Sequence, residues 1–321
     1  GQPLRNGMKM LNSALAPAKT SSENAKTVRC VAASDIDGIE PDLQQWAKAN
    51  GFTGKAGSVL LVPGSDGLSV KSALLGIGDS SEPFCAGTLA KNLPEGVWAL
   101  TADGSFNLRL ASIGFLLGAY RYTAYKKESL PRPQLLLDPS LDRADIVRQV
   151  EATWLVRDLV NTPANDMGPE QIESAARAVA KSAKASIKLI KGDDLLAKNF
   201  PMIHAVGRAS TSAPRLIDFS WGDKKAPKVT LVGKGVAFDT GGLDIKPASA
   251  MRNMKKDMGG AANVLGLAKI IMDAKLNVRL RVLIPAVENS IAGNAFRPGD
   301  VLQSRKGLTV EIGNTDAEGR L

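Results

Sequence analysis

The sequence predicts an α/β protein with a small N-terminal α/β domain, a linking helix and a larger α/β domain with a mixed sheet. Strand and helix patterns alternate along the 321 residues, as they do in α/β folds. Pro131 and Pro133 interrupt this alternation and suggest a domain boundary. Carboxylates, lysines and glycines gather in loops after predicted strands beyond residue 232. We therefore expect the second domain to carry the functional site.

The composition excludes several classes of protein. A hydrophobic content of 44% is ordinary for a globular protein, and no run approaches the roughly 18 apolar residues that a membrane span requires. The only cysteines, Cys30 and Cys85, favour a reducing compartment, so we expect a cytoplasmic location. The single histidine, His204, excludes sites built from several imidazoles. Its apolar surroundings suggest a histidine at the edge of the core.

Residues 1–30 form a basic segment that we expect to be flexible. They supply +4 of the net charge of +9, because they contain five Lys or Arg residues and one Glu. A transit-like leader and a disordered tail are both compatible with this composition. A positive balance also permits binding to nucleic acid. That function has no further support, because we find no helix-turn-helix pattern and no aromatic residues interleaved with basic ones.

The N-terminal domain is expected over 31–135, followed by the linking helix over 140–162. The patterns in this part predict helices and strands in alternation: a helix within 35–52, two strands around the turn at 63–67, a helix at 84–91, a strand at 97–101, a helix at 107–122 and the linking helix at 142–161. The linking helix ends before Pro163, because the residue before a proline disfavours helix.

The larger domain is expected over 163–321. Its patterns predict two helices and five strands: a helix at 170–184, strands at 186–190, 215–219 and 228–232, a helix at 250–274, and strands at 278–287 and 308–312. Acidic residues follow two of these strands. Asp239 follows the strand at 228–232, and Asp316 and Glu318 follow the strand at 308–312. Open α/β sheets bind ligands at the carboxyl ends of their strands, so these loops predict one crevice.

The acids in these loops could hold metal ions. Asp257 lies in the predicted helix 250–274, whose other face is apolar, and a carboxylate is costly there unless something pairs with it. With Asp239, Asp316 and Glu318 it makes four acids, enough for two hard or borderline dications. A nearby lysine can also ligate if dications lower its pKa. Solvated turn residues are the alternative, and the residues alone suggest a two-metal hydrolase without deciding it.

Three segments, VGKGVAFDTGG, MKKDMGGAANVLG and NTDAEGRL, resemble the signatures of the leucyl aminopeptidase (cytosol aminopeptidase) family of two-zinc metallopeptidases. VRDLVNTPANDMGP and HAVGRAS match flanking patterns of that family, so the resemblance covers about 145–321. The N-terminal domain resembles that of the shorter bacterial members. The resemblance implies an aminopeptidase that hydrolyses the N-terminal residue of peptides through a water activated by two metals, zinc or manganese.

The resemblance also implies metal ligands. Asp239 and Glu318 would bridge the two metal ions. Lys234 and Asp257 would complete the tighter site. Asp316, helped by its own backbone carbonyl, would complete the more exchangeable one.

Three further residues receive roles from the resemblance. Lys246 would stay protonated and stabilise the oxyanion. Arg320 would hold a bicarbonate ion that serves as general base. Met254 would line the substrate pocket.

The resemblance further implies peptide substrates with a free N-terminus and a homo-hexamer of the full-length protein. Family members continue well beyond the octapeptide NTDAEGRL, whereas this sequence stops there, so we expect the C-terminal part of the catalytic domain to be missing. The 321-residue chain alone is expected to be weakly active or inactive. The alternatives are a non-catalytic fragment and a DNA-binding or scaffolding relative of the family.

Overall fold

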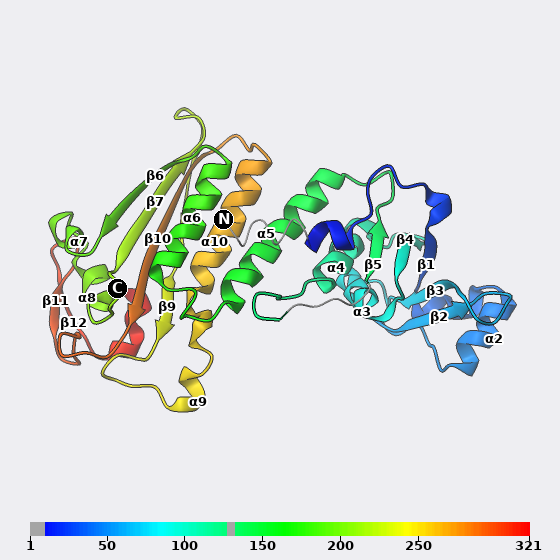
Figure 1. Ribbon diagram of the computed structural model, residues 1–321, viewed down its shortest axis with the longest axis horizontal. Helices are drawn as coiled ribbons and strands as arrows, with labels where there is room; N and C mark the ends of the chain where they lie inside the picture. The colour runs from blue at the N-terminus through cyan, green and yellow to red at the C-terminus, as the bar shows by residue number, and fades with distance from the viewer. Residues whose placement is uncertain (1–9, 127–131) are drawn as a thin grey trace. The chain divides into compact units, whose positions relative to one another are not determined.

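The computed structural model describes residues 10–126 and 132–321, which form two compact units, one within 10–154 and the other over 155–321. Each unit has its own sheet (Figure 1). The α/β fold class predicted from the sequence is confirmed. No helix in the described ranges is both long enough and apolar enough to cross a membrane.

The N-terminal unit is built on a five-stranded sheet with the order β2-β3-β1-β4-β5. Its strands are these: β1 Lys26–Val31, β2 Val59–Pro63, β3 Val70–Gly76, β4 Gly96–Ala102 and β5 Pro133–Leu136. Strand β2 is antiparallel to β3, and the other neighbours are parallel. The helices are η1 Ser22–Asn24 before β1 and, between the strands, η2 Ala33–Gly38, α2 Pro41–Ala49, η3 Pro83–Thr88, α3 Leu89–Asn92 and α4 Leu108–Gly118. Strand β5 was not expected from the sequence, because Pro131 and Pro133 there suggest a boundary.

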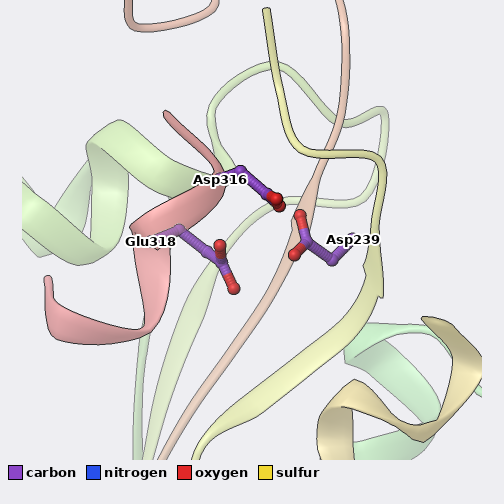
Figure 2. A group of neighbouring side chains, drawn as sticks. All are labelled: Asp239, Asp316 and Glu318. Carbon is purple, nitrogen blue, oxygen red and sulfur yellow. The ribbon is translucent and has the colours of Figure 1, made fainter. Parts of the chain in front are cut away.

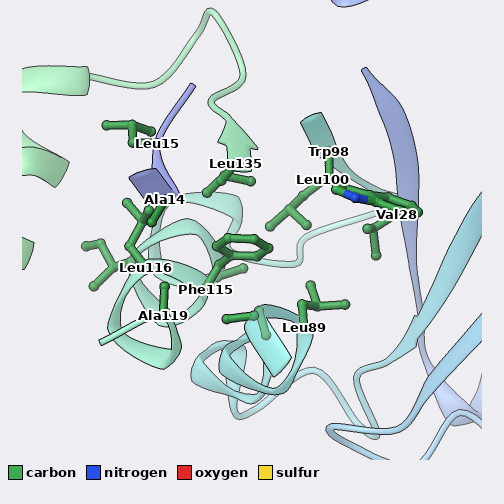
Figure 3. Close-up of a cluster of buried hydrophobic side chains, with 14 of the residues drawn as sticks. Ala14, Leu15, Val28, Leu89, Trp98, Leu100, Phe115, Leu116, Ala119 and Leu135 are labelled. Atoms are coloured by element: carbon green, nitrogen blue, oxygen red, sulfur yellow. The ribbon is translucent and has the colours of Figure 1, made fainter. Parts of the chain in front are cut away.

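The core of this unit lies between the sheet and α4. Phe115 of α4 is fully buried and faces the side chains of Val28, Trp98 and Leu135 from three neighbouring strands (Figure 3). These strands are buried because α4 presents a broad apolar surface to the sheet.

The expectation of a flexible leader over 1–30 is wrong for residues 10–30. A helical turn covers 10–14, and strand β1 begins at Lys26. Leu11 and Leu15 are buried in the same core as Phe115, and Leu15 forms a parallel bridge with Leu135. The basic composition concealed this packing, which rests on a few apolar residues at helical spacing, Met10, Leu11, Ala14 and Leu15. Residues 1–9 lie outside the described part.

Helix α5, Arg143–Asn161, confirms the helix predicted at 142–161. Ile146, Val150 and Trp154 belong to the core of the first unit. Leu155 and Leu159 belong to the core of the second. One continuous helix therefore contributes to both cores.

The second unit has a mixed sheet with the order β6-β7-β10-β8, and β9 also pairs with β10. Its strands are β6 Ser186–Lys191, β7 Arg215–Trp221, β8 Lys228–Val232, β9 Gly235–Asp239, β10 Arg279–Asn289, β11 Val301–Gln303 and β12 Thr309–Glu311. Strands β8 and β9 are parallel to β10, whereas β7 is antiparallel to both β10 and β6. Strands β11 and β12 form a separate hairpin. The mixed sheet is as predicted.

Both faces of β10 are covered. Alternate residues of a strand point to opposite faces, and Leu280, Val282 and Ile284 lie in the larger core with helices α6 Pro169–Ser182 and α10 Gly259–Asp273. Val287 lies in a smaller cluster with Val206 of α8. The remaining helices are α7 Asp194–Ala197, α8 Pro201–Gly207, α9 Ala248–Met251, η4 Met254–Met258 and η5 Thr315–Arg320.

Two differences from the predicted elements concern the site. The helix predicted at 250–274 is divided into α9, the 3₁₀ turn η4 and α10, so Asp257 lies in a turn before the long helix. Strand β9 occupies residues predicted as loop, and Asp239 is its last residue. Strand β9 is a continuation of β8 after a break at Gly233 and Lys234, since both pair with β10 on one side.

Candidate metal centre

The predicted ligands come from four segments at the end of the second sheet. Asp239 ends β9, and Lys234 lies in the break between β8 and β9. Asp257 lies in η4, directly before α10. Asp316 and Glu318 both project from η5. The carboxyl end of the parallel strands thus collects these side chains, as open α/β sheets do with ligand-binding residues.

Three carboxylates converge at this place. Asp239, Asp316 and Glu318 each offer an oxygen, and these three oxygens lie within 4.8 Å of one another. Figure 2 shows Asp316 and Glu318 extending from one turn towards Asp239 on the opposite side. Like charges this close repel one another unless cations lie between them.

Two lysines supply positive charge to this cluster. Lys234 Nζ lies 3.0 Å from Asp257 Oδ2 and 2.8 Å from Glu318 Oε1. Lys246 Nζ lies 2.6 Å from Asp316 Oδ1 and 3.4 Å from Asp239 Oδ2. Each lysine therefore joins two acids from different segments.

Burial makes the carboxylates costly. Asp239 and Glu318 are only 3% and 4% exposed, and burial raises the pKa of both side chains. Among the described residues, Glu318 Oε2 is buried and has no hydrogen-bond partner. A buried carboxylate oxygen without a donor is rarely tolerated, and a divalent cation would satisfy it. The donor set of carboxylates and one amine fits a hard or borderline metal ion.

The lysines are charged in this arrangement. Burial by itself would lower the pKa of Lys234, but Glu318 and Asp257 outweigh burial and raise the pKa. Burial acts in the same direction on Lys246, where Asp316 and Asp239 outweigh it and raise the pKa. Lys234 would therefore have to lose its proton before it could bind a metal ion.

Glycines allow the segments to approach closely. A Cβ on Gly319 would lie 3.0 Å from Lys234 Nζ, and one on Gly260 would lie 2.9 Å from the Lys234 backbone nitrogen. Gly241 and Gly242, which follow Asp239, have φ values of 89° and 68°, a region that favours glycine. The glycine-rich composition of these loops therefore has a steric reason.

Two residues of the site were missed by reasoning from the sequence. The Asn289 amide donates to Asp239 Oδ1 at 2.9 Å. The Thr315 hydroxyl donates to Gly241 O at 2.6 Å, and Asp244 N donates to that hydroxyl at 2.9 Å. A polar residue at the end of the apolar strand β10 was a signal for Asn289, but its partner is 50 positions away in the sequence.

A family model described as "Cytosol aminopeptidase family, catalytic domain" matches residues 154–321, which is more than half of the chain. The chain belongs to the cytosol aminopeptidase family. A second model, "M17 aminopeptidase, N-terminal domain", matches residues 31–138. The resemblance stated from the sequence segments is thereby confirmed.

Several members of the cytosol aminopeptidase family are similar to this chain. A probable cytosol aminopeptidase of Corynebacterium diphtheriae is 40% identical over 293 residues, which are 85% of this chain and 58% of that protein. The chain thus spans less than two thirds of the length of this relative. A probable cytosol aminopeptidase of Corynebacterium glutamicum is 38% identical and is covered to 59%.

Solved structures are also similar to this chain. The cytosol aminopeptidase from Coxiella burnetii is 46% identical, with a TM-score of 0.87, over 94% of this chain and 67% of that one. The bottromycin maturation enzyme BotP in complex with Mn is 31% identical, with a TM-score of 0.81, over 92% of this chain and 67% of that one.

Two further candidate residues, Arg320 and Met254, lie on the same short helices as the carboxylates, in η5 and η4. Arg320 is exposed, and its side chain takes part in no hydrogen bond or ion pair with the residues that the structure describes. Met254 begins η4 and is half-buried. The His204 ring lies 3.0 Å from Asp193 in an ion-pair position, in helix α8. The cluster is therefore formed without histidine.

Proposed function

We propose that the protein containing this chain is a metal-dependent aminopeptidase that removes the N-terminal residue of peptides. The observation that carries the proposal is the buried cluster of Asp239, Asp316 and Glu318, in which one Glu318 oxygen has no hydrogen-bond donor. The cluster belongs to a chain of the cytosol aminopeptidase family.

In this proposal the cluster holds two divalent cations, zinc or manganese. Asp239 and Glu318 would be the ligands shared by both cations, as the resemblance to the family implies; they are also the most buried acids among the described residues. Lys234 and Asp257, which contact each other, complete one site. Asp316 completes the other. The manganese complex of BotP supports the choice of such cations.

The cations would supply a water molecule that loses its proton near neutral pH, together with polarisation of the peptide carbonyl. The chain supplies the remaining groups. Lys246 would keep its proton, as the resemblance to the family implies, and it could donate to an oxygen that gains negative charge. Lys234 gives up its proton to become a ligand, a change that neighbouring dications favour.

The finer features of the proposal follow the family. The free α-amine of the substrate would bind at the centre, which limits cleavage to the first residue. Arg320 is exposed and so accessible to a bicarbonate ion. Met254 is the first residue of η4, the short helix that carries Asp257, and it could line the substrate pocket. We further infer that the protein is a homo-hexamer in the cytoplasm. The word "cytosol" in the names of the relatives supports the location.

The test uses the gene product that contains this chain and a matched pair of peptides. We expect release of the first residue from a peptide with a free N-terminus, and no release from its N-acetylated analogue. A chelator should abolish the release, and added Mn²⁺ or Zn²⁺ should restore it.

The matched variants are Asp239→Asn in the cluster and Asp218→Asn on β7, where the acid pairs with Arg281 at the surface. Only the first should lose activity. Equal cleavage of the acetylated peptide, or activity that survives the chelator, would contradict the proposal.

A further inference from the structure

Asn289 is a fully buried polar residue at the carboxyl end of the central strand β10. It is 0% exposed. It lies opposite Asp239 in the pairing of β10 with β9, just after a bulge between Val287 and Asn289. Bulges redirect the side chain that follows them, and they are common beside functional sites. A buried amide is costly unless its hydrogen-bonding groups are used, so its position calls for a reason.

Both donor hydrogens of the Asn289 amide are used, whereas its Oδ1 is buried without a hydrogen-bond partner among the described residues. Its Nδ2 donates to Asp239 Oδ1 at 2.9 Å and to the backbone oxygen of Thr315 at 3.1 Å. Both partners are pure acceptors, so only the NH₂ end of the amide can face them, and this determines the orientation of the amide. Asn289 thus connects the end of β9 with the turn that carries the other two carboxylates.

The backbone of Asn289 adds to this connection. Its carbonyl oxygen accepts from the Thr240 nitrogen at 3.1 Å and from the Thr240 hydroxyl at 2.7 Å. Thr240 directly follows Asp239. Asn289 therefore fixes the end of β9 through both its own side chain and its own main chain.

These contacts orient the Asp239 carboxylate. Its Oδ1 accepts from the Asn289 amide and from the Gly241 nitrogen at 2.8 Å. Its Oδ2 is left on the side of Lys246, at 3.4 Å from Nζ. Figure 2 shows this carboxylate directed towards Asp316 and Glu318. One oxygen is thus bound within the protein, and the other is available to the cluster.

We propose that Asn289 is a positioning residue for the metal centre: its amide orients Asp239 and sets the distance from Asp239 to the turn of Asp316 and Glu318. This inference rests on the proposed metal-binding function. Asparagine suits the task because it supplies two donors without charge. Aspartate at this position would face two acceptors and add a negative charge beside the cluster.

The test measures binding of Mn²⁺ to the metal-free gene product that contains this chain by titration calorimetry. Asn289→Ala removes both side-chain hydrogen bonds, and we expect the Kd for Mn²⁺ to rise about 10–100-fold, the usual effect of losing a partner of a metal ligand. Asn289→Thr fills the space and keeps one donor, so its effect should be smaller. The control is Ser290→Ala, which removes one hydrogen bond to Glu288 and should leave the Kd unchanged.

Thermal unfolding of the metal-free variants separates positioning from a merely structural role. If Asn289→Ala lowers the Tm but keeps the wild-type Kd, or if neither Asn289 variant folds, the inference is overturned. If the wild-type chain itself binds no Mn²⁺, the proposed function fails as well. Wild-type binding together with an unchanged Kd in Asn289→Ala contradicts the positioning role alone.

Discussion

Lys234 and Lys246 make similar contacts in the structure, yet their positions suggest different roles. Lys234 Nζ contacts Asp257 and Glu318, two of the proposed ligands, from a break in the strand. Lys246 reaches Asp316 and Asp239 from the loop beyond Gly242. A metal ligand must be neutral, whereas a group that stabilises an oxyanion must be charged. Single substitutions can distinguish these roles.

Lys234→Ala is expected to reduce metal content and turnover together, most strongly at low metal concentration, because it removes a ligand. Lys246→Ala should keep both metal ions and reduce turnover by roughly 10²–10³, the usual effect of losing one oxyanion donor. Metal content per chain and kcat, measured side by side in the gene product that contains this chain, decide the matter. Loss of metal in the Lys246 variant with full metal in the Lys234 variant would reverse the assignment.

At the scale of elements, the start of α10 lies against the break between β8 and β9. The Ala261 nitrogen donates to Lys234 O at 2.8 Å. A Cβ on Gly260 would lie 2.9 Å from Lys234 N, whereas one on Gly259 would meet nothing within 4 Å. A side chain is therefore sterically excluded at Gly260 but not at Gly259. Gly260 allows the backbone contact that positions Lys234.

These glycines provide a matched pair of variants. Gly260→Ala should destabilise the second unit by about 1–3 kcal/mol, because the added methyl group overpacks a backbone contact. Gly259→Ala should stabilise it by about 0.4–1 kcal/mol, since alanine restricts the unfolded chain and the helix accepts it. Urea unfolding of the metal-free chain, followed by circular dichroism, measures both. Equal effects of the two substitutions would contradict the proposed close approach.

At the scale of the whole molecule, the chain contains two large hydrophobic cores in separate compact units. Ile113 of α4 is 6% exposed in the first core. Ile284 of β10 is fully buried in the second. The metal centre belongs to the second unit alone. We therefore expect the two units to unfold separately and only one to respond to metal.

Calorimetry of the 321-residue chain should show two transitions. Ile113→Val should lower the free energy of unfolding in only one transition, by about 0.5–1.5 kcal/mol, and Ile284→Val should lower it by a similar amount only in the other. Mn²⁺ at 100 times its Kd should stabilise the transition that Ile284→Val affects, by about 2.7 kcal/mol. A single transition that both substitutions lower equally would show that the units unfold together.

Sequence patterns determined much of this picture because they are local. Helix α5 and strand β10 follow from the spacing of their apolar residues, and α5 ends before Pro163 as predicted. The gathering of Asp239, Asp316 and Glu318 followed from their places after strands, and the resemblance to a family added Asp257. Their exact roles stay predictions.

Only the tertiary structure decided which residues support these carboxylates. Asn289 contacts Asp239 and Thr315, which are 50 and 26 positions away from it. The packing of Leu15 on Leu135 is likewise remote in the sequence. Local periodicity carries no information on such pairs, because they arise when strand pairing brings distant segments together. The sequence by itself determined the elements and the chemical groups, and long-range pairing decided how these groups are held.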